Sequence, residues 1–292
     1  MTSEPASTNN SYLFDPESAP EMARLINMDH LTTKAMGGPL AEQPKSKIAA
    51  MSQILDIACG PGGWVLDTAF EHPDIEVAGI DISQTMIGYA NARARSQGLP
   101  NASFEVMDVT QPLPFSDQSF DLVNGRFLVG FLLQTAWPKL IAECSRILRP
   151  GGVLRLTETD IFGITTSPAS ERLNGLFMQA THQSGYGFSA DGRTFGMTPM
   201  LEPLLRQGGF KDIQCRAHAL SFPADTPNWS NWRKNAEVAF LQIGAYLVQL
   251  GHLSQEEADR LCQQVSVEML QPEFAGTFLF LTAWGTKCDA RQ

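Results

Sequence analysis

The sequence predicts an α/β protein whose core is a doubly wound parallel sheet. Two observations favour this fold. Short apolar segments with strand character alternate with helical segments from about residue 51 to residue 160, and a glycine-rich turn follows the first of these strands. The chain has 292 residues, 43% of them hydrophobic, which is enough to bury one large core or two small ones. We therefore expect parallel strands joined by right-handed helical crossovers.

Periodicity and turn residues define the elements of the core. The helix expected from Ser83 to Gly98 has a serine at its N-cap and a glycine at its C-terminal stop. The other two helices of this part are expected at 63–72 and 137–148. The five strands are expected at 53–58, 75–81, 102–109, 120–128 and 153–158.

The segment before the core predicts a separate helical unit. Residues 1–10 are polar and are expected to be disordered, whereas apolar residues recur at helical spacing from 16 to about 30, at Met22, Leu25, Ile26 and Met28. A Met-Gly-Gly-Pro sequence breaks this helix. We expect residues 1–50 to form a tail and a helical lid.

After residue 160 the alternation changes. Helices are expected at 167–185, 228–250 and 254–270, and at 198–210, where Thr198 would be the cap and Gly208 and Gly209 the end. Strands are expected at 211–222 and 276–287, with about 50 residues of mainly helical sequence between them. We therefore expect three parts: residues 1–50, a core over 51–160, and residues 161–292, whose cap helices accompany the final strands of the same sheet.

The composition of the chain restricts the classes of partner that it is expected to bind. The formal net charge is -10 and the sequence pI about 5.0, which disfavours a nucleic acid and favours a small-molecule partner. The five cysteines are odd in number and include no CxxC pair, which indicates reduced thiols rather than a disulfide frame or a metal site. No apolar run approaches the roughly 18 residues that a membrane helix needs, and the start lacks a signal-peptide pattern. A cytoplasmic protein without a membrane or metal partner is expected, as a monomer or homodimer.

The glycine-rich turn narrows the class of ligand. It reads Asp-Ile-Ala-Cys-Gly-Pro-Gly from Asp56 to Gly62. A Walker loop needs a GxxxxGK[ST] pattern, whose lysine is absent here. A nicotinamide dinucleotide loop prefers a third small residue, and the corresponding position is Val65. This position weakens the dinucleotide alternative.

From about residue 50 to 160 the chain resembles the class I S-adenosylmethionine-dependent methyltransferase family. The resemblance rests on the turn, with Ala58 in place of the first glycine, on Asp81, 19 residues after Gly62, and on Asp108 after the third strand. The segments LPFSDQSFDLVNGRFL and ILRPGGVLRL also match. The later LLRQGGF and TAWGTK are similar to ubiquinone- and menaquinone-biosynthesis methyltransferases and to natural-product relatives from secondary metabolism.

The resemblance implies a fold, a cofactor and its contacts. The fold would be a seven-stranded Rossmann-like methyltransferase sheet with an N-terminal helical lid and a helical cap before the last strand. The cofactor would be S-adenosylmethionine, with S-adenosylhomocysteine as product. Asp56 would order the loop and bind the ammonium, Asp81 the ribose hydroxyls, and Asp108 the adenine amino group. The implied cofactor contacts are Asp56, Ala58, Gly60, Gly62, Asp81, Ile82, Met86, Met107, Asp108, Val109, Asn124, Arg126 and Tyr12.

The reaction implied is an in-line displacement that moves the methyl group to an O, N or C atom of a small molecule. Aromatic residues in the variable parts predict a partly apolar or aromatic substrate, with contacts from Phe127, Phe131, Tyr186, Trp229 and Trp232. The candidate general bases are His182, His30 and Asp160. Three alternatives stay open: a cofactor-binding enzyme that steers a cyclisation or rearrangement, a nicotinamide-dependent oxidoreductase, and a non-enzymatic subunit.

Overall fold

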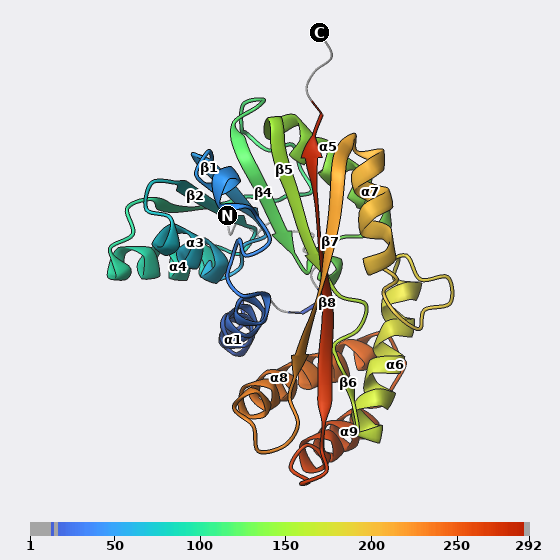
Figure 1. Cartoon of the computed structure of the whole chain (residues 1–292). Helices are drawn as coiled ribbons and strands as arrows, with labels where there is room; N and C mark the ends of the chain where they lie inside the picture. The colour runs from blue at the N-terminus through green and yellow to red at the C-terminus, as the bar shows by residue number, and fades with distance from the viewer. Residues whose placement is uncertain (1–12, 15–16, 289–292) are drawn as a thin grey trace, which may run out of the picture.

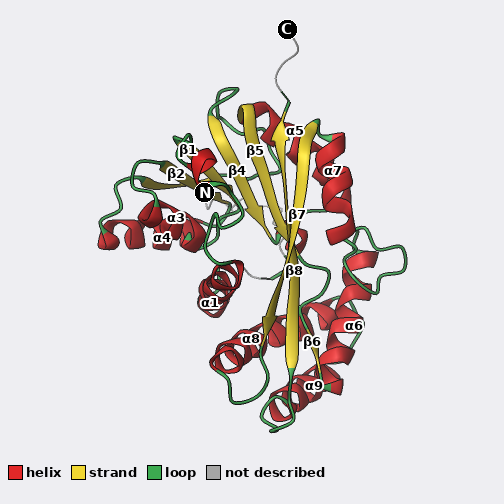
Figure 2. Ribbon diagram, viewed as in Figure 1, coloured by secondary structure: helices red, strands yellow, loops and turns green. Residues whose placement is uncertain are grey.

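The computed structural model describes residues 13–14 and 17–288. One sheet runs through the molecule, with helices packed against both of its faces (Figures 1 and 2). The α-helices are α1 Ala19–Met36, α2 Lys45–Ile48, α3 Gly63–Glu71, α4 Gln84–Gln97, α5 Trp137–Ile147, α6 Pro168–Gln183, α7 Leu201–Gln207, α8 Pro227–Gln249 and α9 Gln255–Glu268. The strands are β1 Gln53–Ile57, β2 Glu76–Asp81, β3 Ala102–Val106, β4 Phe120–Arg126, β5 Leu148–Glu158, β6 Ile164–Thr165, β7 Phe210–Ser221 and β8 Gly276–Lys287.

The strand order confirms the doubly wound fold. It is β3-β2-β1-β4-β5-β8-β6, with β7 paired to β8, and β1 to β5 run parallel while β8 is antiparallel to its neighbours. The described sheet thus has eight strands where the sequence analysis expected seven. The additional strand is β6, a two-residue pairing with the start of β8 that is too short to show a periodic pattern.

Helices on both faces of the sheet explain why the central strands β1, β4 and β5 are mainly apolar and largely buried. Ile54 packs with α3 and α4 residues on one face, whereas Leu55 and Ile57 pack with α5 and the later helices on the other. Strands covered on both faces read as continuous apolar runs, which is the pattern of a parallel α/β sheet. The expected caps of α4 are present: the Ser83 side chain accepts from the backbone N–H of Met86, and Gly98 is left-handed.

The last two long strands extend the sheet beyond its parallel part. β8 pairs with β5 only over 281–286 but with β7 along most of its length, so the two strands form a ribbon that continues toward α6, α8 and α9 (Figure 1). Helices α8 and α9 connect β7 to β8, as expected.

Two local expectations need correction. Thr198 does not cap a single helix, because its hydroxyl donates to Asp160 and a short 3-10 turn, Thr198–Met200, precedes α7. The first helix is longer than expected and ends at Met36, followed by the left-handed Gly37.

A line of buried polar side chains crosses the middle of the sheet. Arg155 on β5 is fully buried; its Nε donates to Glu42 Oε1 at 2.7 Å, and its Nη1 donates to Asn124 on β4. Asn124 Nδ2 in turn donates to Asp56 Oδ1 at 2.7 Å. A buried charge costs several kcal/mol unless it is paired and hydrogen-bonded, so each member of this line needs the next.

Removal of one member of this line is expected to be costly. Arg155→Met leaves the carboxylate of Glu42 buried without its cation, and we expect the free energy of unfolding to fall by about 3–5 kcal/mol. Urea unfolding followed by circular dichroism measures this. The double variant Arg155→Met/Glu42→Leu removes both charges and should be more stable than the single variant. An equal or larger fall in the free energy of unfolding of the double variant would contradict the pairing of Arg155 with Glu42.

Candidate functional site

A cavity lies at the carboxyl ends of β1, β2 and β4, between the core and α1. Ligand sites of doubly wound sheets are expected at this edge. Its walls come from α1, the turn after β1, the ends of β2 and β3, the turn after β4, the segment after β5, and β8. The lining residues from segments outside 51–160 are Leu13, Phe14, Arg24, Leu25, Met28, Asp29, Thr32, Phe162, Phe195 and Phe278.

The glycine-rich turn is shaped by three left-handed residues. The φ angles are 53° at Ala58, 54° at Gly60 and 78° at Gly62. A Cβ at Gly62 would lie 2.5 Å from the ring of Phe104, so this position needs glycine for packing rather than for ligand contact. Gly62 does not line the cavity, whereas Ala58 and Gly60 do. Alanine at a left-handed position costs roughly 1–2 kcal/mol, so the backbone at position 58 favours glycine over the alanine that is present.

Asp81 ties the end of β2 to this turn. Its Oδ2 accepts the backbone N–H of Gly60 at 2.8 Å, and its Oδ1 accepts that of Ser83 at 2.9 Å. Burial raises the pKa of this carboxyl, and the two backbone donors offset part of the rise. Asp108, after β3, is held in a similar way by Thr110, whose N–H and hydroxyl donate to Oδ1 at 2.9 and 2.7 Å. Both acids line the cavity.

Asp56 is the most deeply placed acid of the site. It is 2% exposed, and Asn124 supports it from behind without lining the cavity itself. Burial raises its pKa to about 7, although the charge of Arg126 and the hydrogen bond from Asn124 oppose the rise. The carboxyl of Asp56 is therefore balanced between its two protonation states near neutral pH.

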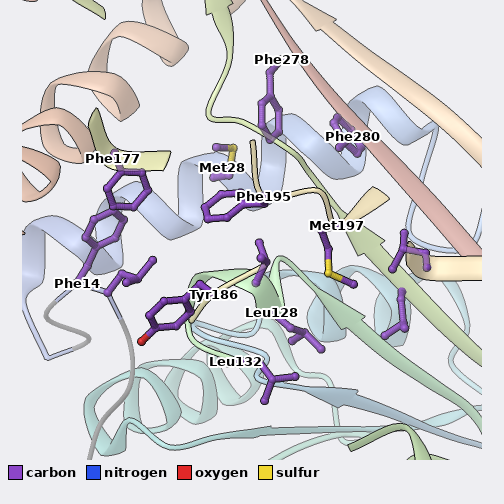
Figure 3. Close-up of a cluster of buried hydrophobic side chains, with 14 of the residues drawn as sticks. Phe14, Met28, Leu128, Leu132, Phe177, Tyr186, Phe195, Met197, Phe278 and Phe280 are labelled. Carbon is purple, nitrogen blue, oxygen red and sulfur yellow. The ribbon is translucent and has the colours of Figure 1, made fainter. Parts of the chain in front are cut away.

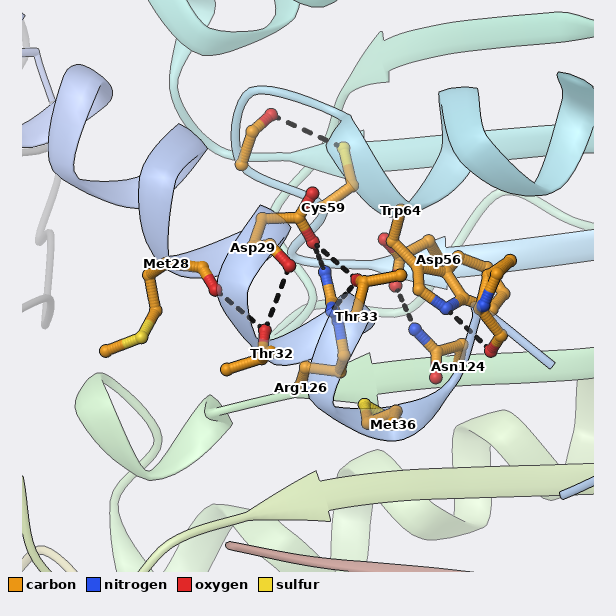
Figure 4. A network of polar contacts seen from close by, with 12 residues as sticks. Met28, Asp29, Thr32, Thr33, Met36, Asp56, Cys59, Trp64, Asn124 and Arg126 are labelled. Carbon is orange, nitrogen blue, oxygen red and sulfur yellow. Dashed lines mark hydrogen bonds and ion pairs between the residues drawn. The ribbon is translucent and has the colours of Figure 1, made fainter. Parts of the chain in front are cut away.

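Arg126, at the end of β4, joins the core to α1. Its guanidinium forms an ion pair with Asp29 and donates to Thr33 Oγ1 at 3.1 Å (Figure 4). A Cβ at Gly63 would fall 1.7 Å from Asp29 Oδ2, so a glycine at the start of α3 allows this carboxylate to approach. The sequence analysis missed Asp29. A signal exists in its helical spacing, four residues after Leu25 and seven after Met22, which puts an acid on the apolar face of α1.

The structure brings most of the expected cofactor residues to this one cavity. Asn124 and Gly62 lie behind it, as described above, and Tyr12 lies outside the described residues. The expected cofactor and substrate residues that line it are Asp56, Ala58, Gly60, Asp81, Ile82, Met86, Met107, Asp108, Val109, Arg126, Phe127 and Phe131.

The three candidate bases are placed elsewhere. His182 is exposed in the last turn of α6 and His30 is exposed on α1. Asp160 accepts from the backbone N–H groups of Met197 and Thr198 at 2.6 and 3.1 Å, in addition to the Thr198 hydroxyl. Because none of the three lines the cavity, none is placed to act as a general base on a ligand bound there. For the two histidines, the rotation of each helix about its axis decides which way the side chain points. Residue type alone does not reveal this rotation.

Three expected substrate contacts also lie outside the main cavity. Trp229 donates its Nε1 to Met269 O at 2.9 Å, and Trp232 stacks on Phe222 with ring centroids 4.2 Å apart. Tyr186 is buried beside Leu133, where burial raises its pKa to about 12. Trp229 and Tyr186 pack in the core and the cap instead, whereas Trp232 lines a second, smaller cavity.

Other phenyl rings, from distant segments, form the apolar part of the cavity. Phe162 and Phe195 meet edge to face at 6.2 Å, and Phe127 and Phe278 lie 6.0 Å apart. Figure 3 shows Phe14, Phe195, Phe278 and Met28 gathered around this space. Sequence analysis identified Phe127 but not Phe195 or Phe278, because only the folded topology brings residues 195 and 278 together.

Neither a metal centre nor a membrane span is found in the part of the chain that the structure describes. Within residues 13–14 and 17–288, no group of three or more His, Cys, Asp or Glu side chains is arranged to hold a metal ion. Over the same residues, no helix combines the length and apolar character needed to cross a bilayer.

Comparison with known proteins provides evidence that is separate from the geometry of the site. The family model described as "Methyltransferase domain" matches residues 54–152. The chain is 28% identical over 204 residues to methyltransferase pytC of Aspergillus terreus, covering 70% of this chain and 58% of that protein. It is 26% identical over 183 residues to demethylmenaquinone methyltransferase of Geobacillus kaustophilus, covering 59% of this chain and 76% of that protein. The solved structure of YcgJ from Bacillus subtilis has a similar fold, with a TM-score of 0.51 at 20% identity, over 82% of this chain and 94% of that one.

The turn at Ala58 gives a test of its backbone geometry. Ala58→Gly removes the Cβ from a left-handed position, and we expect thermal unfolding to show a protein stabilised by about 0.5–1 kcal/mol after the entropy of glycine is subtracted. Ala58→Val adds a β-branched side chain there and should destabilise the protein.

Gln118 is a matched control, because it is also left-handed, at 57°, but lies in an exposed turn away from the cavity. Gln118→Gly should stabilise by a similar amount. A destabilised Ala58→Gly beside a stabilised Gln118→Gly would contradict the strain at position 58.

Proposed function

We propose that this chain is a member of the class I S-adenosylmethionine-dependent methyltransferase family and transfers a methyl group from S-adenosylmethionine to a small, partly apolar or aromatic molecule. The match of residues 54–152 to a methyltransferase-domain model and the similarity to pytC support this proposal. The observation that carries the proposal is the alignment of three acids, Asp56, Asp81 and Asp108, along one cavity beside the glycine-rich turn. The chain spans 58% of the length of pytC, so its activity is argued from its own site.

The polar groups that line the cavity fit an adenosyl ligand with an amino-acid end. Asp81 offers a buried carboxylate for two neighbouring hydroxyls, a geometry that suits the ribose. Asp108 would accept from the adenine amino group, with Met107 and Val109 against the ring. At the other end, Asp56 would bind the ammonium and Arg126 the carboxylate, for which Arg126 would have to share or leave Asp29.

The apolar half of the cavity would hold the methyl acceptor. When bound, S-adenosylmethionine supplies a methyl carbon that is already activated by its sulfonium, so the chain needs no nucleophile of its own. The phenyl rings of Phe127, Phe162 and Phe278 would exclude water and orient the acceptor, the two contributions that most accelerate an in-line displacement. Aromatic faces also favour a nearby cation.

Two further outcomes would change the proposal. An isomerised product formed without consumption of S-adenosylmethionine would assign the site to a cyclisation or rearrangement. Quenching of tryptophan fluorescence by reduced nicotinamide cofactor, with S-adenosylmethionine silent, would assign it to an oxidoreductase. Product analysis by mass spectrometry and fluorescence titration distinguish these outcomes from methyl transfer.

Cofactor binding tests the proposal most directly. Isothermal titration with S-adenosylmethionine should show one saturable site. Asp81→Ala removes a charged acceptor of two hydrogen bonds and should weaken binding by at least about 30-fold.

Asp81 also holds Gly60 and Ser83, so the unfolding temperature of the free variant must be measured in parallel. The matched control is Asp74→Ala, an exposed acid before the opposite end of β2, which should leave binding unchanged. Absence of binding of both S-adenosylmethionine and S-adenosylhomocysteine by the folded wild type would disprove the proposal.

The raised pKa of Asp56 predicts a pH dependence of binding. An ammonium ligand favours the carboxylate, and with a pKa of about 7 in the free protein most Asp56 is protonated at pH 5.5. Affinity should therefore rise as pH increases, by about 20-fold from pH 5.5 to 7.5. Titrations at fixed ionic strength measure it. Asp56→Asn should flatten the profile at a reduced affinity, and a steep profile in this variant would refute the role of Asp56.

A further inference from the structure

A second, much smaller cavity adjoins the main one on the side of helices α6 and α8. The two share Arg24, Met28 and Phe162, so these three side chains stand between them. The remaining walls of the second cavity come from β6, α6, α8 and the segment between α9 and β8. They are Thr165, Ser170, Trp232, Asn235, Ala236, Ala239, Phe240, Ile243, Met269 and Phe274.

Two polar groups in these apolar walls have an atom without a hydrogen-bond partner. Asn235 is 3% exposed and its Oδ1 accepts no hydrogen bond among the described residues, while its Nδ2 faces Met28 Sδ at 3.5 Å. Ser170 is 1% exposed and its hydroxyl is likewise unpartnered within the described chain. A buried polar atom without a partner costs about 1–3 kcal/mol, so such atoms usually mark a place that something else satisfies.

The charges at the junction between the two cavities restrict which chemical group could satisfy these unpartnered atoms. Arg24 donates to both carboxylate oxygens of Glu21 at 2.7 Å, and Gln242 Nε2 donates to the same carboxylate at 2.9 Å. Because the carboxylate of Glu21 neutralises the guanidinium, the junction does not select an anion. Asn235 Oδ1 accepts hydrogen bonds only, which calls for a donor.

We propose that the second cavity is a subsite for the far end of the methyl acceptor, and that this end carries a neutral hydroxyl. The acceptor would be elongated and mainly aromatic or apolar: one part lies among the phenyl rings of the main cavity, and the terminal hydroxyl donates to Asn235 Oδ1 and accepts from Ser170. This inference rests on the proposed function, since it assigns the specificity of the same site.

A matched pair of probes tests the subsite. 4,4′-Dihydroxybiphenyl and 4-hydroxybiphenyl differ only in the far hydroxyl. Isothermal titration of each into the protein saturated with S-adenosylhomocysteine gives the preference directly. We expect the diol to bind about 3–10-fold more tightly, the value of one neutral hydrogen bond.

Asn235→Leu keeps the shape of the side chain and removes the acceptor. It should abolish the preference for the diol while leaving the affinity for S-adenosylhomocysteine unchanged. The free variant should be as stable as the wild type or more so, because an unpartnered buried amide oxygen has been removed. Ser170→Ala, a smaller change, should reduce the preference. The control is Asn231→Leu, one turn earlier on α8 and not in the cavity lining, which should keep it.

Three results would overturn the subsite: equal binding of the two probes to the wild type, a retained preference in folded Asn235→Leu, or binding of S-adenosylhomocysteine but of neither probe. Failure of the proposed function is seen separately, as loss of S-adenosylhomocysteine binding by the folded wild type before any probe is added.

Discussion

The polar line through Asp56, Asn124 and Arg155 is the constraint on which the site depends. Asp56 pairs in register with Asn124, and Asn124 with Arg155, so the three side chains lie on one face of adjacent strands β1, β4 and β5. Glu42 closes the line from the segment after α1. Each buried group needs the next one, and the register of the parallel strands therefore fixes the acid at the end of β1 before any ligand enters.

The same acid connects the sheet to α1. Burial raises the pKa of Asp56, the positive charges of Arg126 and Arg155 lower it, and Asp29 raises it again. Asp29 belongs to α1 and is paired with Arg126, so a displacement of α1 alters the balance of charge around Asp56. The position of the first helix and the protonation of the cofactor end are thus physically coupled, through one ion pair rather than through the backbone.

The elements of the core could be predicted well because the residue patterns that indicate them each lie within a short segment of the sequence. The strands, the glycine-rich turn and the acids at 56, 81 and 108 each lie within a short segment whose apolar period ends at a turn. Asp29, Phe195 and Phe278 lie in segments that only the strand order brings to the cavity. His182 and His30 were chosen by chemistry, but the rotation of α6 and α1 exposes them. That rotation depends on tertiary packing, which a single sequence does not display.

The difference between the locally predictable core and the segments that only the tertiary fold brings together has a consequence for acceptor specificity. The acids of the proposed cofactor end all fall within residues 54–152, the segment that the family model matches. By contrast, the walls of the second cavity are Arg24 and Met28 on α1 together with residues from Phe162 to Phe274, all outside that segment. The match to the methyltransferase-domain model therefore bears on the proposed site of the methyl donor and says little about the acceptor. The acceptor has to be inferred from the long β7–β8 ribbon, the cap helices and the unpartnered amide oxygen of Asn235, which are features of this chain's own structure.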